Sequence, residues 1–404
     1  MKAFERLIHY AQIHTSSDDK SRTTPSSDRQ RDLSLVLRDE MTALDFDGVY
    51  VDEHAYVYGF LPATAGREGE PCIALIAHLD TIPDSDFSGK DVRPRLVENY
   101  DGGELPLGES GRILSPSLFP DLENLKGHTL ITTDGTTILG ADDKAGIAEI
   151  LTACEELLRS GLPHGRVAVC FTPDEEIGHG ASLLSFERLG ADFGYTVDGG
   201  GLDQINTETF NAAEVTVTLT GVNVHPGDAK GRMRNASLLA VEFAGLLPAA
   251  ERPETTQGYE GFFHLTDMSG TVDRSSLSYI VRDHDAVHFE IRKNMMAQAA
   301  VYLNEKYGQG TASLTVRDQY RNMAEVLQRC PQAVSRAEDA IRKAGLTPRR
   351  VPVRGGTDGS QLSFRGLPCP NLGTGGACFH GPYEHISVQN MDLAVRILIN
   401  LLTA

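Results

Sequence analysis

The sequence has few of the features that mark secreted, disulfide-stabilised or membrane-spanning proteins. Its six cysteines are scattered, and no two of them form a C-x-x-C pair. Such cysteine usage is typical of a reduced intracellular protein. No apolar run approaches the roughly 20 residues that a membrane span needs, and the N-terminus lacks the apolar core of a signal peptide. We therefore expect a cytoplasmic protein that has no membrane partner.

Basic residues are also scarce relative to acidic ones. The chain carries 37 Lys and Arg against 56 Asp and Glu, which gives a formal net charge of −19. This excess of negative charge disfavours nucleic acid and anionic membranes as partners. An acidic field attracts cationic groups such as metal ions and free amines, although acidity also serves solubility.

Over the first 210 residues, patterns typical of helices alternate with patterns typical of strands. This alternation predicts an α/β sandwich with a largely parallel central sheet. Residues 84–130 are rich in Gly, Pro, Ser and Asp, which predicts a long loop. Loops of this length inside a domain are usually functional or carry small hairpins. The apolar strand runs lie near residues 49–61, 72–77, 166–171 and 194–197.

The pattern changes after Phe210. Residues 211–321 follow the order strand, helix, strand, strand, helix, strand, which is the βαββαβ layout of ferredoxin-like domains. We therefore predict two domains. Residues 1–210 and 322–404 form the larger one, and residues 211–321 are inserted into it.

Two adjacent carboxylates follow an apolar strand in the segment Phe171-Thr-Pro-Asp-Glu175-Glu176. Charged groups at the end of a buried strand are costly unless something compensates them, and in open α/β sheets that edge is where ligands bind. A pair of glutamates suits a division of labour in which one holds a metal and the other moves a proton. Taken alone, the pair fits a solvated acidic turn better than a metal site.

Four further segments place ligand-type side chains at strand ends or turns. An apolar strand ends in His78-Leu-Asp80, where the alternation of strand side chains allows Asp80 to orient His78. Asp142 stands at the start of a helix, where a lone aspartate is most often an N-cap. Asp198 ends a strand before three glycines, and His380 lies in a Gly-rich loop.

Taken together, the five segments indicate a metal centre. Two histidines with three or more carboxylates suit zinc, cobalt or manganese. Magnesium and calcium are weaker alternatives because histidine is a poor ligand for them. Nucleophilic catalysis is also less well supported, since the chain has no G-x-S-x-G motif and no Cys beside a convincing His.

The motifs resemble the peptidase T family of tripeptide aminopeptidases, within the two-zinc exopeptidase superfamily that also contains aminoacylases and related carboxypeptidases. The resemblance extends over essentially the whole chain. Besides the metal motifs, it rests on residues 97–100, 130–135, 223–227, 258–262, 279–283, 354–359 and 367–372.

This resemblance implies two zinc ions per subunit, for which Co²⁺ or Mn²⁺ could substitute. Asp142 would bridge the two ions. His78 and Asp198 would complete one site, and Glu176 and His380 would complete the other.

The resemblance also assigns catalytic roles. Glu175 would act as general base on a water activated between the two zinc ions. Asp80 would hold His78 in its ligating tautomer.

The inserted domain would serve as a lid. There the resemblance assigns substrate binding to His225, Arg282 and Arg354, and the two arginines suit the carboxylate of a peptide C-terminus. The family dimerises through this lid, so we expect a homodimer in which the lid histidine reaches the partner's active site.

Two positions depart from the family pattern. Asp228 follows His225-Pro-Gly where a small hydroxyl residue is usual, and its charge could raise the pKa of His225 or weaken carboxylate binding. His385 stands where an aromatic residue is typical and could compete with His380 as a ligand.

The sequence thus predicts a cytoplasmic dizinc aminopeptidase that removes the N-terminal residue from short peptides, tripeptides above all. The alternatives on the same scaffold are a dipeptidase, a carboxypeptidase and an N-acyl-amino-acid deacylase. A binding protein without catalysis is a further alternative, but the presence of the base and of all five ligand residues argues against it.

Overall fold

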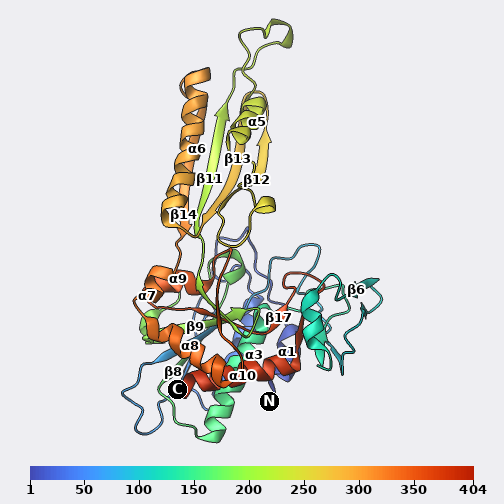
Figure 1. Ribbon diagram of the computed structural model, residues 1–404, viewed down its shortest axis with the longest axis vertical. Coiled ribbons are helices and arrows are strands. Elements are labelled where there is room, and N and C mark those ends of the chain that lie inside the picture. The colour runs from blue at the N-terminus through green and yellow to red at the C-terminus, as the bar shows by residue number, and fades with distance from the viewer. The chain divides into compact units, whose positions relative to one another are not determined.

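The computed structural model describes residues 1–404 and divides them into two compact units (Figure 1). The first unit contains Met1–Thr207, Glu325–Val351 and Thr357–Ala404. The second unit contains Glu208–Ala324 and the short segment Pro352–Gly356. The sequence pattern predicts an inserted segment at residues 211–321, whereas the second unit also includes residues 352–356, which the prediction places in the larger domain.

The first unit is built on an eight-stranded mixed sheet with the strand order β1-β2-β8-β3-β9-β16-β10-β15. Its four middle strands, from β8 to β16, run parallel, whereas β1, β2 and β10 pair in antiparallel fashion. The strands are β1 (Asp47–Val51), β2 (Val57–Leu61), β3 (Ile73–His78), β8 (Val167–Thr172), β9 (Phe193–Gly199), β10 (Gln204–Glu208), β15 (Arg349–Pro352) and β16 (Asn371–Gly373).

The run near residues 49–61 forms two strands, β1 and β2, rather than one. The carboxylate of Asp52 accepts the backbone N–H groups of His54 and Tyr56, and Ala55 has a left-handed φ of 71°. These contacts close a tight turn in the middle of the apolar run. Because the turn is held by the Asp52 side chain, the hydrophobic pattern of the run does not reveal it.

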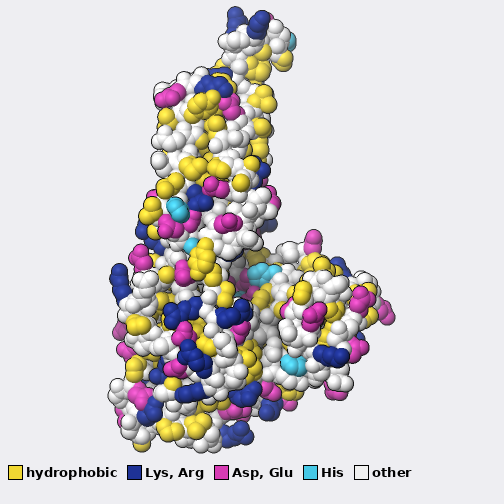
Figure 2. Space-filling model, in the orientation of Figure 1, with side chains coloured by type: hydrophobic (Ala, Val, Ile, Leu, Met, Phe, Trp, Pro, Cys, Tyr) yellow, Lys and Arg dark blue, Asp and Glu magenta, His cyan; other side chains and the backbone are white.

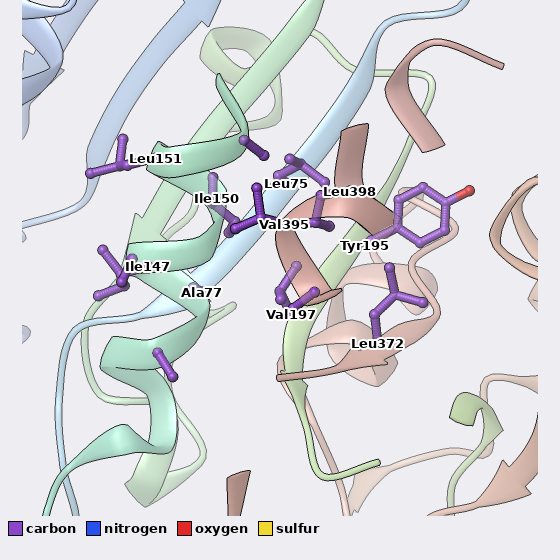
Figure 3. Close-up of a cluster of buried hydrophobic side chains, with 14 of the residues drawn as sticks. Leu75, Ala77, Ile147, Ile150, Leu151, Tyr195, Val197, Leu372, Val395 and Leu398 are labelled. Atoms are coloured by element: carbon purple, nitrogen blue, oxygen red, sulfur yellow. The ribbon is translucent and has the colours of Figure 1, made fainter. Parts of the chain in front are cut away.

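Helices cover both faces of this sheet. On one face α3 and α10 pack over the middle strands, where Leu75, Ile150, Val197 and Leu398 form part of a continuous core (Figure 3). Because both faces are covered, β3 and β8 are buried along their whole length and are apolar up to their last residues, His78 and Thr172. The helices are α1 (Ala3–Ala11), α2 (Gln30–Ala43), α3 (Ala141–Ser160), α4 (Phe186–Leu189), α7 (Ala324–Gln328), α8 (Pro331–Lys343), α9 (Asp358–Phe364) and α10 (Val388–Leu402).

The excursion over residues 84–130 contains short strands and a 3₁₀ helix. One strand pair makes a hairpin, and another strand joins a small four-stranded sheet with the order β17-β18-β7-β4. The elements are β4 (Arg95–Val97), β5 (Leu105–Leu107), β6 (Arg112–Leu114), η1 (Pro120–Leu125), β7 (Leu130–Thr132), β17 (Gly376–Ala377) and β18 (His385–Ser387).

The second unit has the ferredoxin-like βαββαβ order and a four-stranded antiparallel sheet, β12-β13-β11-β14. Helices α5 and α6 pack against this sheet, and Phe243 of α5 shares one core with Val215, Val217 and Leu277 of the strands. The elements are β11 (Asn211–Thr220), η3 (Pro226–Asp228), α5 (Ala236–Leu246), η4 (Pro253–Thr255), β12 (Phe262–Gly270), β13 (Arg274–Asp283), α6 (Ala286–Tyr307) and β14 (Ala312–Tyr320).

Two surface properties bear on function. None of the helices combines the length and the apolar character needed to cross a bilayer. On the face drawn in Figure 2, basic side chains alternate with acidic ones and form no continuous patch.

Candidate active site

The ligand-type residues of the first unit meet at the carboxyl edge of the parallel strands. β3 ends at His78, and its neighbour β8 is followed directly by the turn η2 (Glu175–Ile177) that carries Glu175 and Glu176. On the other side of β3 lies β9, in which Asp198 is the last residue but one. Parallel neighbours end at the same edge of a sheet, which is why residues about 120 positions apart in the chain come together.

Asp142 reaches this edge from the start of α3. Its backbone is not helical, with φ −85° and ψ 102°, and the N-cap of the helix is Gly140. The N-cap role that is most common for a lone aspartate is therefore not the role of Asp142. One turn into the helix, a side chain at Gly146 would collide with the carbonyl of Val197, so the glycine lets α3 lie directly against β9. This close packing brings Asp142 beside Asp198.

The carboxylate of Asp142 lies between two histidines. Its Oδ1 is 2.9 Å from Nε2 of His78, and its Oδ2 is 3.1 Å from Nε2 of His380. On the outer sides, Asp198 Oδ1 lies 3.7 Å from His78 Nε2, and Glu176 Oε2 lies 3.2 Å from His380 Nε2. The five predicted ligands thus form two sets that share Asp142.

The electrostatics of the cluster reflect a surplus of carboxylates. Burial alone would raise the pKa of Asp142, but hydrogen bonds with His380 and His78 hold that pKa well below its ordinary value. Burial raises the pKa of Glu176 to about 7, and burial together with the charge of Asp142 raises the pKa of Asp198 to about 7. Hydrogen bonds to Asp142 and Glu176 raise the pKa of His380 to about 11. Buried carboxylates that resist ionisation in this way need positive charge beside them.

The donor set fits divalent cations. Donor atoms of His78, Asp142 and Glu176 lie within 4.8 Å of one another, and so do those of His78, Glu175 and Asp198. One oxygen of Glu176, Oε1, is buried and has no hydrogen-bond partner. Imidazole nitrogens combined with carboxylate oxygens suit zinc, cobalt or manganese. An unpartnered buried oxygen within such a set is the feature that a bound cation would satisfy.

Asp80 connects the metal-ligand strand to the glutamate turn. Its carboxylate accepts the backbone N–H of Glu175 at 3.0 Å and that of Glu176 at 3.2 Å. Nδ1 of His78 lies 2.9 Å from the main-chain carbonyl of Asp80 and 3.4 Å from its carboxylate. Asp80 therefore orients His78 mainly through its backbone, and its side chain is used to position the turn, which the sequence did not indicate.

His385 does not belong to the cluster. Its Nε2 lies 2.9 Å from Asp121, its Nδ1 lies 2.9 Å from the carbonyl of Tyr383, and the side chain is buried. Both ring nitrogens thus have partners outside the cluster, which leaves His380 as the histidine of this loop that faces Asp142.

Two buried carboxylates beside the cluster were missed in the sequence. Glu384 accepts backbone N–H groups from the loop that precedes Asp142. Asp358 accepts the hydroxyl of Thr172, and a side chain at Gly180 would collide with its carboxylate. Asp358 lies in the 354–359 motif on which the resemblance rests, but no role was assigned to it there. The only sequence signal for Glu384 is a charge in a Gly-rich segment, and such a charge is ordinarily a surface residue.

The three predicted substrate-binding residues all lie in the second unit. Arg282 donates to the carbonyls of Ala213 and Val281 and to Gln319. Arg354 donates to the carbonyls of Gly258 and Glu260 and to Thr256. Neither guanidinium is paired with a carboxylate, so neither forms the ordinary surface ion pair that would account for its charge.

His225 lies at the other end of that unit. The strand β11 pairs Ala212 with Arg282 at one end and Thr220 with Arg274 at the other. Eight strand residues span ~27 Å, and His225 follows beyond Thr220 in an exposed loop, where its Nδ1 accepts the N–H of Gly227. Arg282 and His225 are therefore far apart within one copy of the unit.

Comparison with known proteins defines the class. Residues 129–404 match the model of peptidase family M20/M25/M40, and the chain belongs to this family. Peptidase T of Clostridium perfringens is 49% identical over 402 residues, which cover 99% of this chain and 98% of that protein. The chain is therefore an enzyme, an aminopeptidase of the peptidase T type within the family.

Solved structures show the same fold. The aminopeptidase PepT of Bacillus cereus superimposes with a TM-score of 0.78 at 22% identity, over 100% of this chain and 97% of that one. A tripeptidase of Staphylococcus aureus gives a TM-score of 0.79, also at 22% identity and with the same coverage. The match extends through both units, so the α/β sandwich with an inserted ferredoxin-like segment is the fold of these relatives.

Proposed function

We propose that the protein is a metal-dependent aminopeptidase that removes the N-terminal residue from tripeptides. The observation that carries this proposal is the position of Asp142, whose two carboxylate oxygens each face a different histidine. A carboxylate in this position is suited to bridge two cations, which we propose to be zinc, with cobalt or manganese as substitutes. His78 and Asp198 would hold one ion, and Glu176 and His380 would hold the other.

Two bound cations would polarise the scissile carbonyl and lower the pKa of a water molecule. The chain itself supplies the proton transfer. Glu175 would accept a proton from the attacking water as the new C–O bond forms, and would deliver it to the leaving nitrogen as the C–N bond breaks. Burial and the charge of Asp198 raise the pKa of Glu175 well above its ordinary value, which makes its carboxylate a stronger base than an exposed one.

Arg282 and Arg354 are proposed to bind the substrate's C-terminal carboxylate. Both guanidiniums are held by backbone carbonyls, so their direction is fixed while their charge is not neutralised by a carboxylate. A fixed arginine is suited to a planar carboxylate. Recognition of the C-terminal carboxylate would account for a preference for short peptides.

His225 is proposed to act on the active site of a second copy in a homodimer formed through the second unit, the lid. Support comes from its location, because it lies at the opposite end of β11 from Arg282. Mixing two inactive variants tests this arrangement. His225→Ala and Glu175→Gln should restore activity when they exchange subunits, since one site of the mixed dimer is then complete. A histidine that acts within its own chain would give no recovery.

We further propose that the enzyme works in the cytoplasm, where short peptides with free N-termini are its substrates. The six cysteines are unpaired, and five of them are buried. Free thiols of this kind persist in reducing compartments.

The substrate assignment is tested by incubating the zinc-loaded protein with Ala-Ala-Ala, N-acetyl-Ala-Ala-Ala and Ala-Ala. Mass spectrometry then identifies the products, with an isotope label in the first residue. Release of labelled Ala from the free tripeptide alone is the expected result. Cleavage of the acetylated peptide would indicate a deacylase or a carboxypeptidase, and cleavage of Ala-Ala alone would indicate a dipeptidase. No cleavage at all would support a non-catalytic binding protein.

A further inference from the structure

Glu384 makes an unusual set of contacts next to the metal centre. Its Oε2 accepts the backbone N–H groups of Leu139 at 2.7 Å and Gly140 at 2.8 Å, and its Oε1 accepts that of Asp142 at 3.1 Å. The side chain is only 2% exposed. One buried carboxylate thus satisfies three backbone donors in the four residues that end at Asp142.

These donors have no alternative acceptor within the helix. The first N–H groups of a helix lack intrahelical partners, and the non-helical backbone of Asp142 leaves this start irregular. Backbone N–H groups that are buried need an acceptor, and the two oxygens of Glu384 supply one for all three of them. Glu384 therefore fixes the backbone from which the Asp142 side chain projects.

The same chain segment carries a second ligand. Glu384 follows His380 by four residues, and the next residue, His385, is anchored to Asp121 and to the carbonyl of Tyr383. A single anchored loop thus presents His380 to one oxygen of Asp142 and supports the Asp142 backbone from the other side. The loop therefore sets the distance between the two proposed ligands His380 and Asp142.

We propose that Glu384 is a positioning residue that holds Asp142 in its bridging position before any metal binds. The proposal rests on the two-metal centre proposed above. It assigns to Glu384 no contact with metal or substrate. Glu384 is expected to increase metal affinity and turnover, because residues that orient metal ligands typically account for about 10–100-fold in affinity or activity.

The substitution Glu384→Gln keeps the size of the side chain but replaces one acceptor oxygen with an NH2 group. This NH2 group would face a backbone N–H, which it cannot accept. Metal binding is followed through the visible absorption of Co²⁺ added to metal-free protein and through Zn²⁺ competition with a chromophoric chelator. We expect the affinity for the metals to fall by about 10–100-fold, and kcat to fall with little change in KM. Asp192→Asn is the control, since Asp192 accepts the N–H of Cys72 at the opposite edge of the sheet.

The outcomes separate the two proposals. Absence of stoichiometric metal binding by the unsubstituted protein would overturn the proposed metal centre. Normal metal binding by both the unsubstituted protein and Glu384→Gln would overturn the role of Glu384 alone. Urea unfolding of Glu384→Gln and Asp192→Asn shows whether a lower metal affinity arises without a lower free energy of unfolding.

Hydrogen exchange provides a test that needs no variant. In the metal-free, unsubstituted protein, the amides of Leu139, Gly140 and Asp142 should exchange slowly, because Glu384 holds them without metal. Residue-resolved exchange by mass spectrometry measures this directly. Fast exchange at these amides in the metal-free state, followed by protection on addition of Zn²⁺, would show that the metal organises the loop and would overturn the proposal.

Discussion

The carboxylate of Asp80 accepts the backbone N–H of Glu175 at 3.0 Å, and the backbone carbonyl of Asp80 lies 2.9 Å from Nδ1 of His78. One residue therefore fixes both the histidine at the end of β3 and the glutamate at the end of β8. Asp80 thus fixes the position of the proposed metal ligand relative to the proposed general base, with no intervening side chain.

Replacing Asp80 should lower turnover more than it lowers stability. Asp80→Asn keeps the backbone carbonyl that faces His78 but replaces one of the two oxygens that accept the N–H groups of Glu175 and Glu176 with an NH2 donor. We expect kcat to fall by roughly 10–100-fold, as for other residues that orient metal ligands. Steady-state kinetics and bound-metal analysis check this. Asp52→Asn, which disrupts a comparable pair of amide contacts in the β1–β2 turn, should leave kcat near normal.

Replacing the general base should separate metal binding from catalysis. Glu175→Gln preserves the size of the side chain and is expected to retain both metals, because Glu175 is not among the five assigned ligands. Loss of general base catalysis should lower kcat by about 10²–10⁴-fold. Metal content by mass spectrometry and turnover of Ala-Ala-Ala are measured on the same sample. Unchanged turnover would remove Glu175 from the mechanism.

The pair His385–Asp121 should make stability depend on pH. Burial would lower the pKa of His385, but hydrogen bonds to Asp121, Cys378 and the Tyr383 carbonyl raise it to about 9. A histidine with a raised pKa stabilises the folded state fully below its unfolded pKa of roughly 6.5, and this stabilisation is lost as pH rises through about 9. Asp121→Asn should therefore cost about 1–2 kcal/mol at pH 6 and little at pH 10, a modest figure because Asp121 is 43% exposed.

The measurement for this pair is urea unfolding at a series of pH values. Glu123→Gln is the matched control, since Glu123 lies in the same 3₁₀ helix η1 and forms no ion pair. A cost for Asp121→Asn that does not change between pH 6 and pH 10 would contradict the assignment of a protonated His385.

Glu149 is a second source of pH dependence, with the opposite origin. This residue of α3 is fully buried, neither carboxyl oxygen has a hydrogen-bond partner, and burial raises its pKa well above the ordinary value. The folded state keeps the proton while the unfolded state releases it above a pKa of roughly 4.3, so stability falls as pH rises from there, by up to about 1.4 kcal/mol per pH unit until the folded pKa is reached.

Glu149→Gln should remove this loss. The variant should be more stable than the parent at pH 8 by about 1–3 kcal/mol, with a smaller difference at pH 5. Urea unfolding at the two pH values measures the effect. Glu156→Gln, in the same helix, is the control. A variant that is less stable at pH 8 would show that Glu149 is charged and paired in solution.

The sequence predicts what depends on local patterns. Apolar strands that end in a polar residue indicated the positions of His78, Glu176 and Asp198, because a parallel sheet brings such ends to one edge. The βαββαβ order of the inserted segment was also readable, since its strands alternate and its helices are long. Both features rest on hydrophobic periodicity, which the chain itself carries.

Other features arise only from tertiary structure. The backbone of Asp142 is not helical, and its N–H group is accepted by Glu384, more than 240 residues later. The carboxylate of Asp80 was expected to face His78, but it accepts two amides of a turn on the neighbouring strand. A single charged residue does not reveal the backbone groups that it will meet, so neither contact could be predicted from spacing.

Anomalous X-ray diffraction from zinc-loaded crystals is the decisive test of the proposal that Asp142 bridges two metal ions. The predicted result is two peaks at the zinc absorption edge, one between Asp142, His78 and Asp198 and the other between Asp142, Glu176 and His380. A single peak, or peaks that lie away from Asp142, would contradict the account.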